Sequence, residues 1–211
     1  MALQNRVTPF GDIVATPARG AWMGNRGVLH GSDRTLSRRR WTTRAWITCR
    51  LEFKDRHRRV MTPGRYTELF FLDEATALAA GHRPCGECRR HGFDRFRALW
   101  AAVHEPVAGI AALDRALHAA RLDERGAKRT YAWDVDQLPD GVLVTLADRP
   151  SSAFLVCQGA LWPWSAAGYG APFRWTGTVL VLTPRPVVAV IAAGYRPQID
   201  GLAGQARAAR G

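Results

Sequence analysis

Two cysteines three residues apart carry the strongest chemical signal in the sequence. Cys85 and Cys88 lie in the segment Gly81-His-Arg-Pro-Cys-Gly-Glu-Cys88. A Cys-x-x-Cys turn can point both thiolates at one metal ion, because the turn offers its backbone amides to the sulfurs. Two thiolates form only half of a tetrahedral site, so other ligands must come from elsewhere in the chain.

A carboxylate inside an apolar segment is the second candidate for chemistry. Glu68 interrupts the apolar run of residues 66–72. An enzyme that excises a base needs such a group, either to activate water or to stabilise a positively charged sugar. The alternative is that Glu68 faces solvent at the start of a strand.

Two loops have residues suited to holding a phosphate or a base. The segment Gly24-Asn-Arg-Gly27, followed by His30, has glycines that let a ligand come close to the backbone. It also has an amide side chain and a cationic side chain that could contact this ligand. The segment Leu161-Trp-Pro-Trp-Ser-Ala-Ala-Gly-Tyr169 gathers three aromatic rings and could form one wall of a base pocket, although such residues also build cores. The predicted catalytic residues are Glu68, Asn25 and His30. The predicted base pocket consists of Trp22, Trp162, Trp164 and Tyr169.

The positive charge of the chain is concentrated in one tract. The chain has 30 Lys and Arg against 18 Asp and Glu, and residues 34–59 hold ten of the basic residues with only Glu52 and Asp55 opposing them. Arginine clusters bind phosphates by releasing condensed counterions, so the tract predicts a polyanionic partner. DNA, RNA and an anionic membrane surface all meet this condition, but nearby tryptophans favour bases that can be stacked. A solvated basic face is the alternative. The predicted DNA-binding residues are Arg38, Arg39, Arg40, Trp41, Arg44, Arg56, Arg58, Arg59, Arg89 and Arg90.

The segment Phe71-Leu-Asp-Glu-Ala-Thr-Ala-Leu-Ala-Ala-Gly-His-Arg-Pro-Cys-Gly-Glu-Cys88 resembles part of the metal-binding domain at the N-terminus of the Ada DNA-repair protein. The resemblance covers about residues 41–90. In that family four cysteines hold zinc, and one cysteine of the upstream pair accepts a methyl group from a DNA phosphotriester. Only Cys49 stands upstream here, so the resemblance implies a zinc site of Cys49, Cys85 and Cys88. The fourth position is open to His57, His91, Cys157 or water. Cysteines buried without metal are the alternative.

Local patterns predict the elements that position these residues. Residues 1–40 lack periodicity and are expected to be loop. Residues 41–53 and 59–61 flank a charged tip and suggest a β-hairpin. Residues 66–72 are expected to form a buried strand, followed by a helix that Asp73 caps and Gly81 ends.

The second half of the chain changes from helical to strand patterns. Apolar residues at helical spacing predict amphipathic helices over residues 92–104 and 108–124. Strands are expected at residues 142–146, 153–164 and 179–182, before a last helix that ends at Gly194. Residues 66–84 contain a strand followed by a helix that ends at an Ala-Gly pair, and the same order recurs at residues 175–197. The repeat arose either through duplication or by chance.

Length and composition limit the class of protein. A chain of 211 residues with 47% hydrophobic residues can bury a substantial core. Four cysteines are too few for a disulfide scaffold, and the apolar runs are too short to cross a bilayer. The first residues do not resemble a secretion signal. We therefore expect a cytoplasmic monomer without membrane contact.

These patterns together predict an α+β protein that processes DNA. Its expected parts are a loop-rich arm (residues 1–40), an Ada-like basic module with helices (41–125) and a β-rich part packed on the same core (126–211). The expected role is in repair or in defence against modified foreign DNA, with a glycosylase that removes an altered base as the favoured reaction. The alternatives are a non-catalytic DNA- or RNA-binding zinc-knuckle protein and an Ada-like methyl acceptor that uses Cys49.

Overall fold

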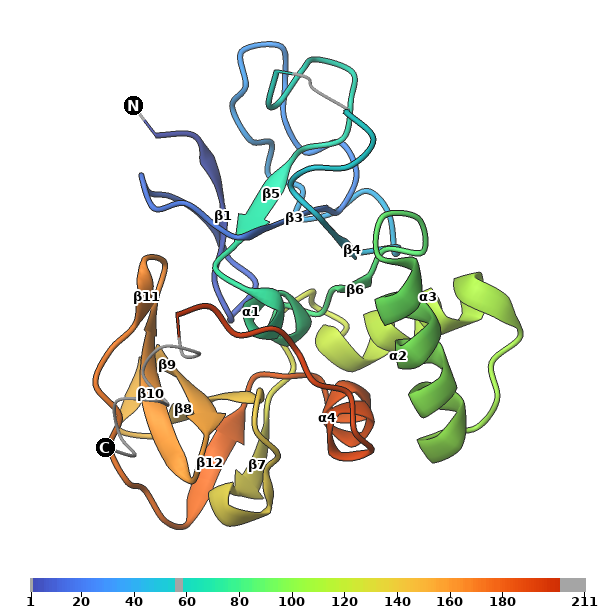
Figure 1. Cartoon of the computed structure of the whole chain (residues 1–211). Helices are drawn as coiled ribbons and strands as arrows, with labels where there is room; N and C mark the ends of the chain where they lie inside the picture. Colours follow the sequence, from blue (N-terminus) through green and yellow to red (C-terminus); the bar gives the residue numbers. More distant parts are fainter. Residues whose placement is uncertain (1, 56–58, 202–211) are drawn as a thin grey trace.

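The computed structural model describes residues 2–55 and 59–201. Two six-stranded sheets lie on either side of a short central helix, and three further helices pack beside them (Figure 1). The architecture is α+β, as predicted from the sequence.

The N-terminal sheet contains short strands in the order β2-β1-β5-β3-β4-β6. Its strands are β1 (Gln4–Val7), β2 (Ile13–Ala15), β3 (Trp22–Asn25), β4 (Ile47–Cys49), β5 (Leu69–Phe71) and β6 (Arg83–Pro84). The pairs β1–β5 and β4–β6 are parallel, and the others are antiparallel. Strand β5 confirms the prediction for residues 66–72. Residues 1–40 contain three strands that the sequence did not indicate, because strands of three or four residues are too short to show alternation.

The β-hairpin predicted for residues 41–53 and 59–61 is wrong. Strand β4 pairs with β3 on one side and with β6 on the other. Both of its edges are therefore occupied by strands that are distant in sequence. Residues 56–58 of the predicted tip lie outside the described residues.

Helix α1 (Glu74–Ala79) is enclosed between the two sheets. The Asp73 carboxylate accepts a hydrogen bond from the amide of Thr76 at 2.8 Å, and Gly81 leaves the helix with a φ of +90°. Both predicted signals are thus confirmed. All six helical residues are buried. Alanines on different faces let each sheet approach closely: Ala75 and Ala79 pack on the second sheet, while Ala77 and Ala80 pack on the first.

The second sheet is antiparallel throughout, in the order β11-β10-β9-β8-β12-β7. Its strands are β7 (Tyr131–Asp134), β8 (Leu143–Leu146), β9 (Arg149–Cys157), β10 (Ala160–Ser165), β11 (Gly168–Tyr169) and β12 (Thr178–Val181). A 3-10 turn, η1 (Val135–Gln137), follows β7. The strands predicted at residues 142–146, 153–164 and 179–182 are confirmed, with a turn dividing the middle segment into β9 and β10.

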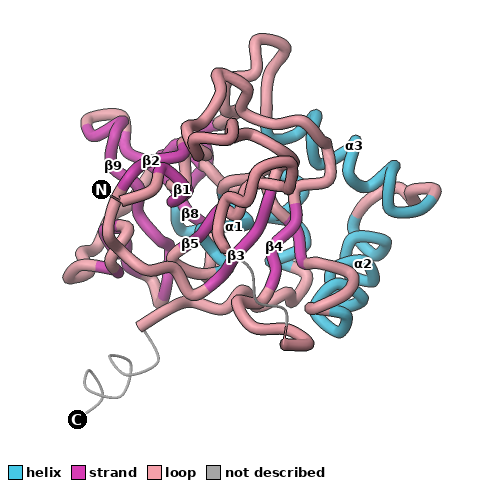
Figure 2. The backbone as a smooth tube through the Cα atoms, turned by 90° about the horizontal axis from the view of Figure 1, so that it is seen from above, coloured by secondary structure: helices cyan, strands magenta, loops and turns pink. Residues whose placement is uncertain are grey.

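Three amphipathic helices complete the main core. They are α2 (Arg90–Val103), α3 (Gly109–Arg121) and α4 (Arg185–Ala192), and all three were predicted. Phe96, Leu117 and Ile191 from these helices pack in one cluster with Val144 and Val181 of the second sheet. Viewed from above, α2 and α3 lie to one side while loops surround the N-terminal strands (Figure 2). Within the described residues, no helix has the length and apolar character needed to cross a membrane.

Candidate functional site

Neighbouring strands bring three thiols together. The amide of Cys85, just after β6, donates to the carbonyl of Thr48 in β4 at 2.9 Å, so Cys85 lies beside Cys49. The following turn places Cys88 two residues before the start of α2. The three Sγ atoms all lie within 4.8 Å of one another. The long-range pairing of β4 with β6 therefore completes the cluster that the resemblance implied.

The crowding of the three thiols changes their proton affinities. Hydrogen bonds from the thiols of Cys49 and Cys88 lower the pKa of Cys85, and the Glu87 amide donates to its sulfur at 3.4 Å. The same contact with Cys85 raises the pKa of Cys49 well above its ordinary value. The cluster thus favours a thiolate at Cys85 that shares the protons of its two neighbours.

The donor set fits a thiophilic metal ion. Sulfurs about 2.3 Å from a tetrahedral Zn²⁺ are roughly 3.8 Å apart, which is compatible with the observed grouping. Among the described residues, no other His, Cys, Asp or Glu joins the three cysteines. Cys157 lies in the core against α1, His91 is exposed, and His57 lies outside the described residues. Cys49, Cys85 and Cys88 are close enough to hold a metal ion, and a tetrahedral ion would keep one further coordination position.

The predicted catalytic residues are hydrogen-bonded within the N-terminal sheet and its loops. Glu68 is buried, and its carboxylate accepts from the amide of Met61 at 2.7 Å. His30 is also buried and contacts the hydroxyl of Thr67 at 2.7 Å. The side chain of Asn25 accepts from the amide of Gly27 at 3.2 Å. The structure does not gather these three residues around either of the two cavities described below.

Three of the four aromatic residues predicted to form a base pocket, Trp162, Trp164 and Tyr169, pack around α1 instead. The indole of Trp164 donates to the hydroxyl of Thr76 at 3.0 Å, and the hydroxyl of Tyr169 donates to Asp73 at 2.7 Å. Trp162 is buried in the same cluster. Trp22 lies on the other sheet. These contacts fix the N-terminal end of α1, and the four residues do not line either cavity.

Arg89 and Arg90 have different surroundings although both were predicted to bind DNA. Arg89 is buried, pairs with Glu74 at 2.6 Å, and lies 4.1 Å from the ring centroid of Trp22. Its guanidinium therefore joins the start of α2 to α1 and the first sheet. Arg90 is exposed and pairs with Asp94 one helical turn further on.

Two loops of the N-terminal module carry most of the predicted DNA-binding arginines. We call residues 28–46 the first basic loop, and residues 50–55 with 59–67 the second basic loop. They are joined to each other, because His30 of the first contacts Thr67 and the carbonyl of Thr62 in the second. The described exposed arginines of these loops are Arg38, Arg39, Arg40, Arg44, Arg50, Arg59 and Arg65. Arg56 and Arg58 lie outside the described residues. Of these seven arginines, only Arg40 forms an ion pair with a described carboxylate, that of Asp12.

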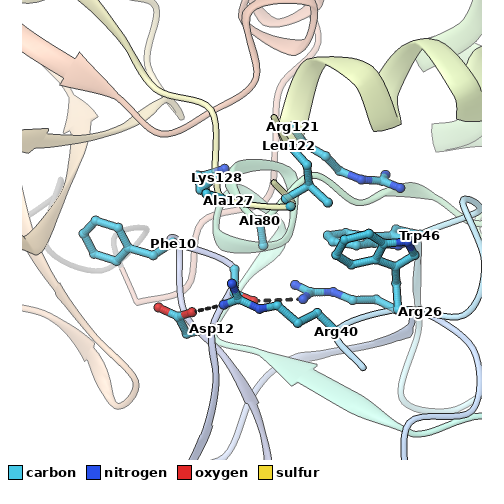
Figure 3. Close-up of a pocket in the computed structure, with 13 residues that line it drawn as sticks. Phe10, Asp12, Arg26, Arg40, Trp46, Ala80, Arg121, Leu122, Ala127 and Lys128 are labelled. Atoms are coloured by element: carbon cyan, nitrogen blue, oxygen red, sulfur yellow. Dashed lines mark hydrogen bonds and ion pairs between the residues drawn. The ribbon is translucent and has the colours of Figure 1, made fainter. Parts of the chain in front are cut away.

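A cavity of about 230 Å³ opens beside the first basic loop, and positive side chains surround it (Figure 3). Its lining comes from the β1–β2 loop, the segment after β3, the first basic loop, the end of α1, and the end of α3 with the segment that follows it. The residues are Phe10, Gly11, Asp12, Arg26, Arg40, Trp41, Trp46, Ala80, Arg121, Leu122, Gly126, Ala127 and Lys128. Arg40 and Trp41 were predicted to bind DNA, and Arg26 is the cation of the segment Gly24-Asn-Arg-Gly27 that was predicted to suit a phosphate or a base. Trp46, Arg121 and Lys128 were not predicted as site residues.

Trp46 separates two buried arginines in this cavity. The guanidinium carbons of Arg26 and Arg121 lie 4.0 and 3.8 Å from the centroid of its ring. Figure 3 shows the ring between the two side chains. Each cation is attracted by the electron-rich face of the indole, which keeps two like charges close without a carboxylate between them.

Backbone carbonyls, rather than carboxylates, hold the cations in place. Arg26 donates to the carbonyl of Gly11 at 2.8 Å, and Arg121 donates to that of Gly81 at 2.9 Å. Lys128 donates to the carbonyl of Ala79 at the end of α1. A β-carbon on Gly81 would lie 2.5 Å from the Arg121 side chain, so this position requires glycine for space as well as for its φ. The Nη2 of Arg26 and the Nε of Arg121 are buried without a hydrogen-bond partner.

Burial and mutual repulsion weaken proton binding throughout the cavity. Burial, together with the charge of Arg40, lowers the pKa of Arg26 to about 9. Burial and the charge of Arg26 lower the pKa of Arg121 to about 8 and that of Lys128 to about 7. Burial beside the same arginines holds the pKa of His82 well below its usual range, so this histidine is neutral. The cavity therefore concentrates more positive charge than the nearby carboxylates of Asp12 and Asp114 offset.

One signal in the sequence could have revealed this cavity. Arg121 follows Leu113 and Leu117 at intervals of four, which places it on the buried face of α3. A charged residue on such a face requires a partner or a function. Arg26 lies in the segment Gly24-Asn-Arg-Gly27, which was predicted to suit a phosphate, but its meeting with Arg121 depends on the pairing of β3 with distant strands.

No known protein family, curated protein or solved structure matches this chain. The resemblance to the Ada metal-binding domain therefore stays an expectation from residues 71–88.

Proposed function

We propose that the protein binds nucleic acid through its basic loops, and that zinc held by Cys49, Cys85 and Cys88 fixes the base of these loops. The observation that carries this proposal is the set of seven exposed arginines on two connected loops, of which only Arg40 is in an ion pair among the described residues. Guanidinium groups that no carboxylate neutralises are available to phosphates.

The thiol cluster supports the proposal through its position. Cys49 ends β4, and Arg50 begins the second basic loop directly after it. Cys85 and Cys88 lie between β6 and α2. A bound zinc ion would supply a cross-link between the start of that loop and the start of α2, which reduces the freedom of the loop before it meets a ligand.

Binding is better supported than catalysis. Glu68, His30 and Asn25 make hydrogen bonds that maintain the loops, so their contacts explain their presence without a reaction. Base excision and methyl transfer to Cys49 stay predictions. The broader conclusion, binding of DNA or RNA, depends only on charge and exposure.

Fluorescence anisotropy with labelled single-stranded DNA, duplex DNA and RNA over a range of salt concentrations tests this function. Replacing Arg38, Arg39 and Arg59 with Gln should weaken binding by roughly 100-fold near 0.15 M salt and reduce the salt slope by about 2 to 3, if each contacts one phosphate. The preferred nucleic acid is the one with the highest affinity at equal salt.

A matched variant separates a specific surface from net charge alone. Replacing the exposed Arg97, Arg115 and Arg174 with Gln removes the same charge from regions outside the basic loops. This control should bind almost as well as the wild-type protein. Equal losses in both triple variants, or no binding even at low salt, would contradict the proposed function.

A further inference from the structure

The cationic cavity has a structural problem that a ligand would solve. Four of its lining residues are basic, and its one acidic residue, Asp12, is paired with Arg40. Arg26 and Arg121 are each only 1% exposed, and each keeps a side-chain nitrogen without a hydrogen-bond partner. Buried donors and charges left in this state are costly, so such a group needs a compensating role. An anion that enters the cavity would supply both charge and acceptors.

The carbonyl contacts of these residues do not remove the need for an anion. Arg121 and Lys128 stabilise the chain at the end of α1 by donating to Gly81 and Ala79. A neutral donor could satisfy the same carbonyls without bringing positive charges together. Cation–π contacts with Trp46 offset part of the repulsion, but they do not use the remaining guanidinium hydrogens.

The size and charge of the cavity favour a phosphate monoester. About 230 Å³ accommodates a phosphate group with part of a sugar, whereas larger ligands need the pockets of 300 Å³ and more that are typical of them. A monoester has a second negative charge and one more free oxygen than the diester inside a strand. Arg26, Arg121 and Lys128 can therefore neutralise a terminal phosphate better than an internal one.

Trp41 extends the recognition to a nucleoside. It lines the cationic cavity and also an adjoining, more open cavity of about 410 Å³. The second cavity adds Glu124, Arg125 and Arg129, which can contact the polar edge of a base. Gly126 lets Trp41 take this position, because a β-carbon there would lie 3.0 Å from the indole. A base stacked on Trp41 would leave its phosphate facing the cations.

We propose that these adjoining cavities bind a nucleotide with a terminal phosphate, the phosphate between Arg26, Arg121 and Lys128 and the base against Trp41. The ligand is either a free mononucleotide or the phosphorylated end of a nucleic-acid strand. This inference deepens the proposed function. It rests on that function only where the ligand is the phosphorylated end of a nucleic-acid strand.

Isothermal titration calorimetry of the full chain with adenosine 5′-monophosphate, adenosine and inorganic phosphate tests the site. The monophosphate should bind at least roughly tenfold more tightly than either adenosine or phosphate alone, because only it occupies both cavities. Replacing Trp41 with Leu should reduce the affinity for the monophosphate to that for inorganic phosphate and leave phosphate binding unchanged. A monophosphate that binds no better than adenosine overturns the proposal.

Charge-removing variants assign the binding to the cations. Lys128→Gln and Arg121→Gln should each weaken monophosphate binding roughly 10- to 100-fold, because each removes a charge-assisted hydrogen bond. Arg115→Gln removes one exposed charge from the same helix as Arg121 and should bind normally. If Arg121→Gln does not fold, the half-buried Lys128 still decides the question. Equal affinities for Lys128→Gln and Arg115→Gln overturn the assignment.

Oligonucleotides distinguish the two sources of the phosphate. Tighter binding of a 5′- or 3′-phosphorylated strand than of its hydroxyl counterpart, lost in Lys128→Gln, identifies a strand end. Equal binding of both strands, with monophosphate binding retained, identifies a free nucleotide. If strands bind through the basic loops but no monophosphate binds, only the cavity proposal fails. If the monophosphate binds but no strand does, only the proposed function fails.

Discussion

Replacing Lys128 with Met should flatten the pH dependence of stability near neutral pH. The Lys128 ammonium is held beside Arg26 and Arg121, and burial with these charges lowers its pKa from 10.5 to about 7. The unfolded chain keeps this proton up to about pH 10, whereas the folded chain loses it near pH 7. Because the unfolded state then binds more protons, the free energy of unfolding increases as the pH rises through 7.

The expected size of the effect follows from the difference in bound protons. Between pH 6.5 and 8.5, integrating that difference for one group with a folded pKa of about 7 gives about 2 kcal/mol. The wild-type protein should therefore gain about 2 kcal/mol more than Lys128→Met over this range. Loss of the hydrogen bond to the Ala79 carbonyl shifts the variant by an amount that does not depend on pH. The titrations of groups that do not interact with Lys128 cancel in the comparison, and the range is kept below pH 9 to limit the contribution of Arg121 and Arg26, which do interact with it.

Urea unfolding in a buffer with low salt and no polyvalent anions measures this difference. Urea is preferable to guanidinium, because a salt denaturant screens the repulsion between the cations. Arg115→Gln serves as the control and should follow the wild-type curve, since this arginine is exposed. Parallel pH profiles for wild type and Lys128→Met would refute the reasoning that Lys128 is held as a half-buried cation repelled by its neighbours.

Three further predictions concern the anion, the metal and the core. The affinity for sulfate measured by calorimetry should fall at least roughly tenfold from pH 6.5 to 9. Sulfate stays a dianion over this range, whereas Lys128 and then Arg121 lose their protons. A constant affinity would show that sulfate binds outside the cationic cavity. The purified wild-type protein should contain about one zinc ion per chain by mass spectrometry. Cys49→Ser should lower this zinc content and reduce the melting temperature. Cys157→Ser, the control, should leave the zinc content unchanged. Asp114→Asn should destabilise the fold by about 3–5 kcal/mol in urea unfolding, because it breaks the buried bidentate pair with Arg83. The double variant Arg83→Met, Asp114→Leu should recover most of this loss of stability. A double variant as unstable as Asp114→Asn would contradict the explanation.

Features with a local cause could be predicted from the sequence. Asp73 accepts from an amide three residues ahead, and Gly81 ends the same helix with a positive φ, so both signals act within one helical turn. The apolar spacing of α2 and α3 likewise requires only that one face meets a core. These elements lie where the sequence placed them because neighbouring residues determine them.

Features with a non-local cause were missed or misassigned. Strand β4 was predicted to belong to a hairpin, but its partners β3 and β6 come from before and after it in the chain. The thiol cluster was predicted only because a family resemblance linked Cys49 to the later pair. The cationic cavity was not predicted as one site, although its Arg26, Arg40 and Trp41 lie in segments that were predicted to bind phosphate or DNA. Arg26 and Arg121 meet only after the sheet and α3 have packed around Trp46.

Strand β4 links the two sites that support the functional proposals. Trp46 precedes the strand and lies in the cationic cavity, while Cys49 ends it in the thiol cluster. Strand β6 holds both ends, because the amide of Arg83 donates to the carbonyl of Trp46 at 3.0 Å and that of Cys85 donates to Thr48 at 2.9 Å. A metal ion that draws Cys49 towards Cys85 would therefore also secure the register that positions Trp46 between its arginines. The thiol cluster is thus suited to support the cavity without taking part in ligand contact.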